Sequence, residues 1–149
     1  MITAKRLNYE FKKITRRIAS DDKAAKKAGF NPNDLPDNGL DFEHWIAESL
    51  NDAGWKTNVT VGSGDQGVDV IAEYQSITVG IRCKLYSGSV GNKAVQEIKS
   101  AIEFHNCDYG VVITNGKYTK SAQDLAKSTD ILLLKHTEIP NLLNIIENK

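Results

Sequence analysis

The sequence contains few of the residues from which zinc sites and disulfide frameworks are built. Its 149 residues include two cysteines, Cys83 and Cys107, which form no CxxC pair, and three scattered histidines, His44, His105 and His136. This composition argues against a zinc site. Because Cys83 lies in an apolar segment and Cys107 near the end of a predicted helix, we expect two buried, reduced thiols.

Long apolar segments are also missing. No run approaches the roughly 20 residues that a membrane-spanning helix needs. The N-terminal segment MITAKRLNYEFKKITRR has no apolar stretch of the kind found in signal peptides. We therefore expect a cytoplasmic protein that does not contact a membrane. The 40% hydrophobic and 26% charged residues are typical of a globular chain with one main core.

The net charge of zero conceals a difference between the N-terminal segment and the rest of the chain. Residues 1–36 contain nine Lys or Arg and four acidic residues, a charge of +5, which leaves −5 for residues 37–149. A basic segment beside an acidic body suits a phosphate-binding arm next to a cation-binding site. The alternative, which is the usual one for such charge runs, is a helix face in contact with water.

The basic segment is predicted to be a helix followed by a loop. Over residues 3–28, apolar side chains recur at helical spacing, namely Leu7, Phe11, Ile14 and Ile18. Since one helix cannot bury a core alone, we divide the chain into an arm and loop at 1–36 and a main domain at 37–149. The apolar stripe supports dimerisation as readily as docking on the chain's own domain. A DNA-binding helix would use Arg16 and Arg17.

The main domain shows a regular order of helix and strand patterns. Helices are expected at residues 41–52, 93–105, 120–127 and 138–148, and strands at 56–61, 68–74, 77–84, 109–114 and 131–134. Asp41 is the expected cap of the first helix, and the segment YSGSVGN is expected to be a loop. A meander followed by β-α units predicts an α/β fold, with a mixed sheet flanked by helices on both faces.

Two neighbouring strands carry the residues that indicate chemistry. A short turn at Gln75 and Ser76 joins them into a hairpin. Because side chains on a strand alternate between the two faces, Arg82 and Lys84 share one face of the second strand. The hairpin is therefore expected to bring Asp69 of the first strand near both of them.

A carboxylate beside a lysine at a strand end suits metal-assisted hydrolysis of a phosphodiester. Asp69 would hold Mg²⁺ or Mn²⁺, and Lys84 would orient or deprotonate a water, or neutralise the developing charge. Glu43, at the edge of the apolar face of helix 41–52, is a candidate second carboxylate. The alternatives are a structural ion pair between Asp69 and Lys84, which spacing alone slightly favours, and a surface position for Glu43.

Several segments together resemble the Mrr-type restriction endonuclease catalytic domain of the PD-(D/E)xK nuclease superfamily. The resemblance covers residues 39–135 and rests on DFEHWIAESLNDAGW, VTVGSGDQGVDVIAE, IRCKLYSGSVGNKAVQEI and GVVITNGKYTKSAQDLA. By motif, it assigns Glu43 to the helix glutamate, Asp69 to the metal-binding aspartate and Lys84 to the catalytic lysine. It implies a restriction-endonuclease-like fold and Mg²⁺-dependent cleavage of DNA, often foreign or modified DNA.

One position departs from the family pattern. Arg82 stands where the family usually has Gln, or Glu in the wider superfamily, and an arginine offers no oxygen to a metal. Cleavage survives if Arg82 turns outward and binds a phosphate. Glu43, Asp69 and the backbone carbonyl of Cys83 would then hold the metal. Alternatively, Glu97 on the following helix supplies the missing oxygen, although a solvent-facing position is the usual one for such a residue.

Residues around these motifs are candidate contacts to nucleic acid. The glycines of GSGDQG permit close approach to a phosphate, so Gln66 would lie near the scissile bond, with Asp65 as an accessory residue that accepts hydrogen bonds within the loop. Tyr86 and Ser87 offer contacts to the nucleic-acid backbone, and Lys93 begins a helix whose N-terminal amides can bind phosphate. An ordinary surface position is the alternative for each.

Three functions follow from these residues. The first is an active nuclease, the second a nucleic-acid-binding module that lost cleavage through Arg82, and the third an assembly or regulatory subunit. No self-contained specificity domain is recognisable, so target choice would come from the arm, a dimer partner or a separate specificity or regulatory subunit. We expect DNA as the substrate, and a homodimer because cutting both strands commonly pairs two active sites.

Overall fold

The computed structural model describes residues 30–60 and 67–149. The predicted N-terminal helix, with Arg16 and Arg17, and the loop residues Asp65 and Gln66 lie outside this part of the chain. The elements, in order, are helix α2 (Gly39–Asp52), strands β1 (Lys56–Val59), β2 (Val70–Tyr74), β3 (Ile77–Lys84) and β4 (Ser89–Val90), helix α3 (Asn92–Phe104), strands β5 (Tyr109–Thr114) and β6 (Lys117–Tyr118), helix α4 (Lys120–Thr129), strand β7 (Leu132–Lys135), the 3₁₀ helix η2 (His136–Asn141) and helix α5 (Leu142–Glu147).

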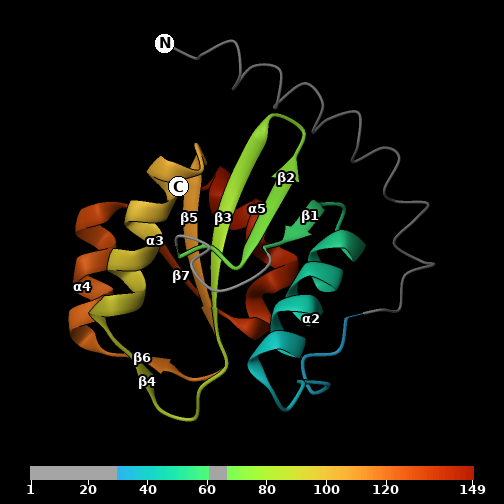
Figure 1. Ribbon diagram of the computed structural model, residues 1–149, viewed down its shortest axis with the longest axis horizontal. Helices are drawn as coiled ribbons and strands as arrows, with labels where there is room; N and C mark the ends of the chain where they lie inside the picture. Colours follow the sequence, from blue (N-terminus) through green and yellow to red (C-terminus); the bar gives the residue numbers. More distant parts are fainter. Residues whose placement is uncertain (1–29, 61–66) are drawn as a thin grey trace.

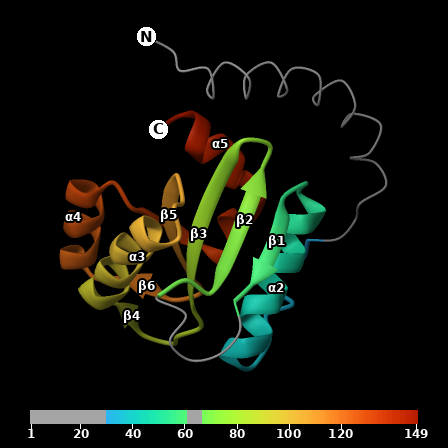
Figure 2. The same ribbon diagram turned by 45° about the horizontal axis from the view of Figure 1, so that its top comes forward.

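The main sheet has five strands in the order β1-β2-β3-β5-β7. The first three run antiparallel as a meander, and β3, β5 and β7 run parallel to one another. Figures 1 and 2 show β2 and β3 side by side as a hairpin, with β1 next to β2. This mixed α/β sheet confirms the fold class predicted from the sequence. No helix within residues 30–60 or 67–149 is long and apolar enough to span a bilayer.

Helices cover both faces of the sheet (Figure 1). We call the side covered by α2, η2 and α5 the α2 face; its core contains Phe42, Ile46, Leu50, Leu142 and Ile146. We call the side covered by α3 and α4 the α3 face; its core contains Ala94, Ile98, Ala101, Ala122 and Ala126. Along β3, the side chains of Val79 and Ile81 belong to the α2 face, so Gly80 and Arg82 belong to the α3 face.

The start of α2 corrects one sequence prediction. Asn38, not Asp41, is the N-cap: its Oδ1 accepts a hydrogen bond from the Asp41 amide at 2.9 Å. Asp41 lies in the first turn, where its carboxylate accepts a hydrogen bond from Asn38 Nδ2 at 2.8 Å. Its acidic side chain suits that turn, because backbone N–H groups at a helix start favour negative charge.

Two further segments differ from the predicted pattern. The segment YSGSVGN, expected to be a loop, contains the short strand β4, which pairs in parallel with β6. The last predicted helix is divided into the 3₁₀ helix η2 and α5, and Pro140 lies inside η2. Proline has no N–H to donate and clashes with the preceding turn of an α-helix. A continuous α-helix over 138–148 is therefore replaced by a tighter turn and a shorter helix.

Candidate active site

The β2–β3 hairpin brings Asp69 opposite Arg82. The register pairs Val70 with Ile81, and the Asp69 amide extends this pairing by donating to the Ile81 carbonyl at 2.8 Å. At this open end of the hairpin, Arg82 Nη1 lies 3.3 Å from Asp69 Oδ1. Asp69 is 6% exposed, so the sheet end carries a buried carboxylate with a guanidinium next to it.

The orientation of the Asp69 carboxylate is set by the backbone of β3. The Cys83 amide donates to Asp69 Oδ2 at 2.8 Å, while Oδ1 faces Arg82. On the other side, the Thr60 amide donates to the Asp69 carbonyl at 2.9 Å. The carboxylate therefore has a fixed direction at the point where β2 and β3 separate, as a metal-binding aspartate requires.

Lys84 is the last residue of β3 and, by strand alternation, shares the face of Arg82. Its backbone is held by β5. The two strands pair Lys84 with Thr114, and Thr114 Oγ1 donates to the Lys84 carbonyl at 2.6 Å. Just beyond, the Tyr86 amide donates to Asn115 Oδ1 at 2.7 Å. The strand end that carries Lys84 is thus fixed on the parallel part of the sheet.

The pKa of the Cys83 thiol is affected by the charges around the end of β3. This pKa is well above the usual value, first because of burial, then because of the negative charges of Asp69 and Glu43, while Arg82 acts in the opposite direction. The Cys83 thiol therefore feels the negative charges of Asp69 and of Glu43 on α2. Glu43 is half-buried, so α2 does not present it fully to solvent.

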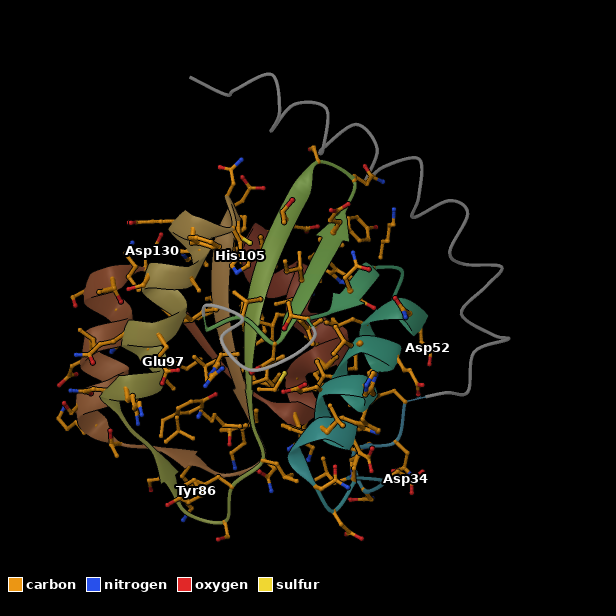
Figure 3. The ribbon with its side chains drawn as sticks, in the orientation of Figure 1. Asp34, Asp52, Tyr86, Glu97, His105 and Asp130 are labelled. Atoms are coloured by element: carbon orange, nitrogen blue, oxygen red, sulfur yellow. The ribbon has the colours of Figure 1, made fainter. Side chains whose placement is uncertain are left out.

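Glu97 enters the same group of side chains from α3. Its Oε2 lies 2.9 Å from Arg82 Nη2, and the two side chains are 26% and 19% exposed. Figure 3 shows Glu97 where α3 lies next to the sheet. The solvent-facing position considered from the sequence is therefore wrong for Glu97. It flanks the inward side of α3, three residues after the buried Ala94.

The other candidate contacts to nucleic acid lie along the adjoining loops. Tyr86 lies on the loop after β3 (Figure 3). It is half exposed, and Ser87 next to it is exposed. Lys93 is exposed in the first turn of α3. The structure brings none of these three into the Asp69–Arg82–Glu97 group through a hydrogen bond or ion pair that it records. Asp65, Gln66, Arg16 and Arg17 lie outside the residues it describes.

Oxygen donors at the strand end have the chemistry that a hard divalent cation requires, because Mg²⁺ takes carboxylate and carbonyl oxygens. Asp69 offers a carboxylate, and Glu97 Oε1 is buried without a hydrogen-bond partner. The arrangement differs from a formed metal centre in one respect: the Arg82 guanidinium stands between the two carboxylates. Within residues 30–60 and 67–149, no three Asp, Glu, His or Cys side chains are gathered closely enough to hold a metal.

Sequence reasoning expected Arg82 near Asp69 but did not predict that Arg82 also pairs with Glu97. It considered Glu97 only as a separate source of oxygen. The structure joins both carboxylates through a single arginine. The available signal was the position of Glu97, at the inward edge of a helix that packs beside β3.

Comparisons with known proteins agree with this fold. A family model described as a restriction endonuclease, the Mrr catalytic domain, matches residues 38–143. No curated protein matches the chain. A solved structure of a protein of unknown function, AF1548, is similar with a TM-score of 0.58 and 25% identity, covering 66% of this chain and 58% of that one.

Two restriction endonucleases are also similar, at lower scores. The DNA modification-dependent restriction endonuclease AspBHI has a TM-score of 0.47 and 18% identity, covering 81% of this chain and 39% of its own. MspJI restriction endonuclease, solved in complex with a 27-mer oligonucleotide, has a TM-score of 0.46 and 18% identity, covering 76% of this chain and 34% of its own. The chain thus spans less than two thirds of the length of each of these three solved chains.

Proposed function

Since the chain belongs to the restriction endonuclease family over residues 38–143, we propose that it is a nuclease that hydrolyses phosphodiester bonds in DNA with a divalent metal ion, Mg²⁺ or Mn²⁺. The observation that carries the proposal is the buried Asp69 carboxylate, oriented at 2.8 Å by the Cys83 amide one residue before Lys84. A directed carboxylate beside a lysine at a strand end is what phosphodiester hydrolysis needs.

The proposal assigns a role to each residue of the site. Asp69 and Glu43, with the backbone carbonyl of Cys83, are the oxygen donors for the metal. When bound, the ion polarises the phosphate and lowers the pKa of an attacking water. Lys84 orients that water and stabilises the negative charge that develops on the phosphate. The pairing of β3 with β5 holds the Lys84 backbone in place for this task.

Contacts to the DNA backbone are proposed for exposed groups around this end of the sheet. Tyr86 and Ser87 follow β3, and Lys93 adds a positive charge in the first turn of α3. Gln66, Arg16 and Arg17 are proposed contacts from the sequence alone. The biological role we propose is defence against foreign or modified DNA in the cytoplasm. A homodimer, with or without a specificity subunit, would place two such sites on opposite strands.

Cleavage of supercoiled and methylated plasmid tests the proposal. The chain is incubated with Mg²⁺ or Mn²⁺ beside Asp69→Asn, which keeps the shape of the side chain and removes its charge. Glu73→Gln is the matched control, because it removes an exposed carboxylate from β2, the strand that follows Asp69. We expect cleavage that Asp69→Asn abolishes and Glu73→Gln retains. Cleavage that persists equally in both variants would show that another protein or another site cuts the DNA.

One observation favours a second function, a nucleic-acid-binding module without cleavage. Arg82 pairs with Asp69 and Glu97, and an arginine supplies no oxygen ligand. If this pairing were permanent, the fold would bind DNA through its basic groups but would not cut it. The same plasmid assay with Arg82→Gln separates the two functions. Cleavage by the unmodified chain supports the nuclease, and cleavage that needs the substitution supports the binding module.

A further inference from the structure

Arg82 connects three elements of the fold. Its Nη1 lies 3.3 Å from Oδ1 of Asp69, which directly precedes β2, and its Nη2 lies 2.9 Å from Glu97 Oε2 on α3. The exposed fractions of the Asp69, Arg82 and Glu97 side chains are 8%, 19% and 26%. The two carboxylates and the guanidinium therefore share a poorly hydrated space, in which their charges interact more strongly than on the surface.

The group is incompletely satisfied. Arg82 Nε and Glu97 Oε1 are both buried, and neither has a hydrogen-bond partner among the residues that the structure describes. Buried polar atoms are normally paired, and an unpaired one costs free energy. The group as it stands has a spare oxygen acceptor at Glu97 Oε1.

Glu97 can be reached from outside. A pocket of about 340 Å³ is lined by Gly67, Gln96, Glu97 and Ser100. Gly67 has a positive φ of 82°, and a Cβ there would lie 2.9 Å from the Glu97 carbonyl oxygen. The absence of a side chain at Gly67 therefore lets the chain pass close to α3 beside the pocket. A small ion can approach the Glu97 side of the ion pair through this pocket.

We propose that Arg82 is an internal counter-ion that a divalent cation must displace from Asp69, and that Glu97 then supplies an oxygen ligand to that cation. This inference rests on the proposed metal-dependent function and adds how metal binding is controlled. In the metal-free protein, the guanidinium pairs with both carboxylates. It leaves Asp69 when the ion binds, and the spare acceptor at Glu97 Oε1 is then used. Arg82 thus weakens metal binding and prevents the site from being occupied at low metal concentration.

Binding of Mn²⁺ to the full chain, without DNA, tests the inference by isothermal titration calorimetry and electron paramagnetic resonance. Arg82→Met removes the guanidinium and adds no oxygen, whereas Arg82→Gln removes it and adds one. We expect both variants to bind Mn²⁺ at least about tenfold more tightly than the unmodified chain, because a positive charge beside the ion is gone. Tighter binding by Arg82→Gln alone, or by neither variant, would overturn the inference.

Matched variants test the specificity of this effect. Lys120→Met removes one positive charge from an exposed ion pair on α4. The affinity of this variant for Mn²⁺ should stay within about twofold of that of the unmodified chain, because exposed charges are screened. Adding Glu97→Gln to Arg82→Met should reverse most of the gain, whereas adding Glu103→Gln, at an exposed position of the same helix, should not. If the tighter Mn²⁺ binding of Arg82→Met persisted after Glu97→Gln was added, Glu97 would not be a ligand to the ion.

A measurement on the unmodified chain avoids any loss of folding in the variants. The side-chain N–H resonances of Arg82 are followed by NMR during titration with diamagnetic Mg²⁺. Displacement predicts a large change in the Nε–H shift and faster exchange with water, and resonances that stay unchanged at saturating Mg²⁺ would overturn it. Plasmid cleavage is scored separately. Tighter Mn²⁺ binding by Arg82→Met without any cleavage supports the inference and contradicts the nuclease function. Cleavage without tighter Mn²⁺ binding supports the nuclease function and contradicts the inference.

Discussion

The two faces of the main sheet are packed with different kinds of side chain. On the α2 face, large side chains such as Phe42, Leu50 and Leu142 are fully buried and form an apolar core. On the α3 face, the helices contribute mainly alanines, and the sheet contributes Gly80 and Gly110. Where α3 meets β3, this face also carries an ion pair between charged side chains, Glu97 and Arg82.

Small residues explain why those charges can meet. A Cβ at Gly110 would lie 2.9 Å from Ile102 Cγ2, so α3 packs closer to the sheet than a side chain at that position would permit. The Glu97 side chain can then contact Arg82 on β3. Burying charge is costly, whereas burying apolar area stabilises the fold. From this comparison we expect the α2 face, with its larger buried side chains, to contribute more to stability than the α3 face.

The largest effect is expected from Lys84→Met, which removes a charge from the α3 face and keeps the length of the side chain. Loss of one electrostatic group that acts in the transition state typically costs about 10²- to 10³-fold in rate. We expect plasmid cleavage to fall by that factor while the urea midpoint of unfolding changes little. Lys117→Met, at an exposed position of β6, is the control and should cut normally. Normal cleavage by Lys84→Met would remove Lys84 from the mechanism.

The α2 face is tested by Leu50→Ala. Leu50 is 0% exposed, and removing such a side chain leaves a cavity that typically costs about 2–5 kcal/mol of unfolding free energy. Leu40→Ala provides the matched control, since Leu40 lies on the same helix but is 63% exposed, and it should change stability by less than about 0.5 kcal/mol. Urea unfolding followed by circular dichroism measures both. Equal losses would contradict the assignment of stability to the buried side of α2.

A smaller loss is expected from overfilling the α3 face with Gly110→Ala. The added Cβ would lie 2.8 Å from Ile131 Cδ1, and such crowding typically costs about 1–3 kcal/mol. Combining it with Ile131→Val removes the nearest methyl group and should recover part of the loss in urea unfolding. Gly39→Ala is the control, because nothing lies within 4 Å of its added Cβ. If Gly110→Ala were as stable as Gly39→Ala, close packing of α3 would not depend on the glycine.

Much of the fold was predictable because its signals are local. The alternating and continuous apolar patterns predicted the strands of the main sheet, and Gln75 adopts the positive φ of 56° in the turn expected to join β2 and β3. The N-cap was missed because Asn38 and Asp41 are both good capping residues, and only the hydrogen bonds distinguish them. The strand β4 was missed because two residues carry no periodicity, and its partner β6 is distant in sequence.

The candidate site was predictable only in part, for a similar reason. Strand alternation and a tight turn are enough to bring Asp69 beside Arg82, and the structure has them 3.3 Å apart. The contact between Arg82 and Glu97 depends on how closely α3 packs on the sheet, which the glycines determine at a distance in sequence. No pattern within a single segment contains that information. The catalytic and metal-binding roles of Glu43, Asp69 and Lys84 stay predictions.

The smallest effect is expected from an ion pair in contact with water, which sharpens the contrast with Arg82. Lys120 Nζ lies 3.6 Å from Asp124 Oδ1, and the two side chains are 88% and 62% exposed. Lys120 is also the first residue of α4, where a positive charge opposes the helix dipole. We expect Lys120→Gln to change the unfolding free energy by less than about 0.5 kcal/mol, and 0.5 M NaCl to abolish the difference in urea unfolding.

Arg82→Met should lower stability by several times more, and salt should hardly alter that loss, because the substitution leaves two poorly hydrated carboxylates without their counter-ion. If both losses were equally small and equally sensitive to salt, Arg82 would be an ordinary surface charge and the two faces would differ only in packing.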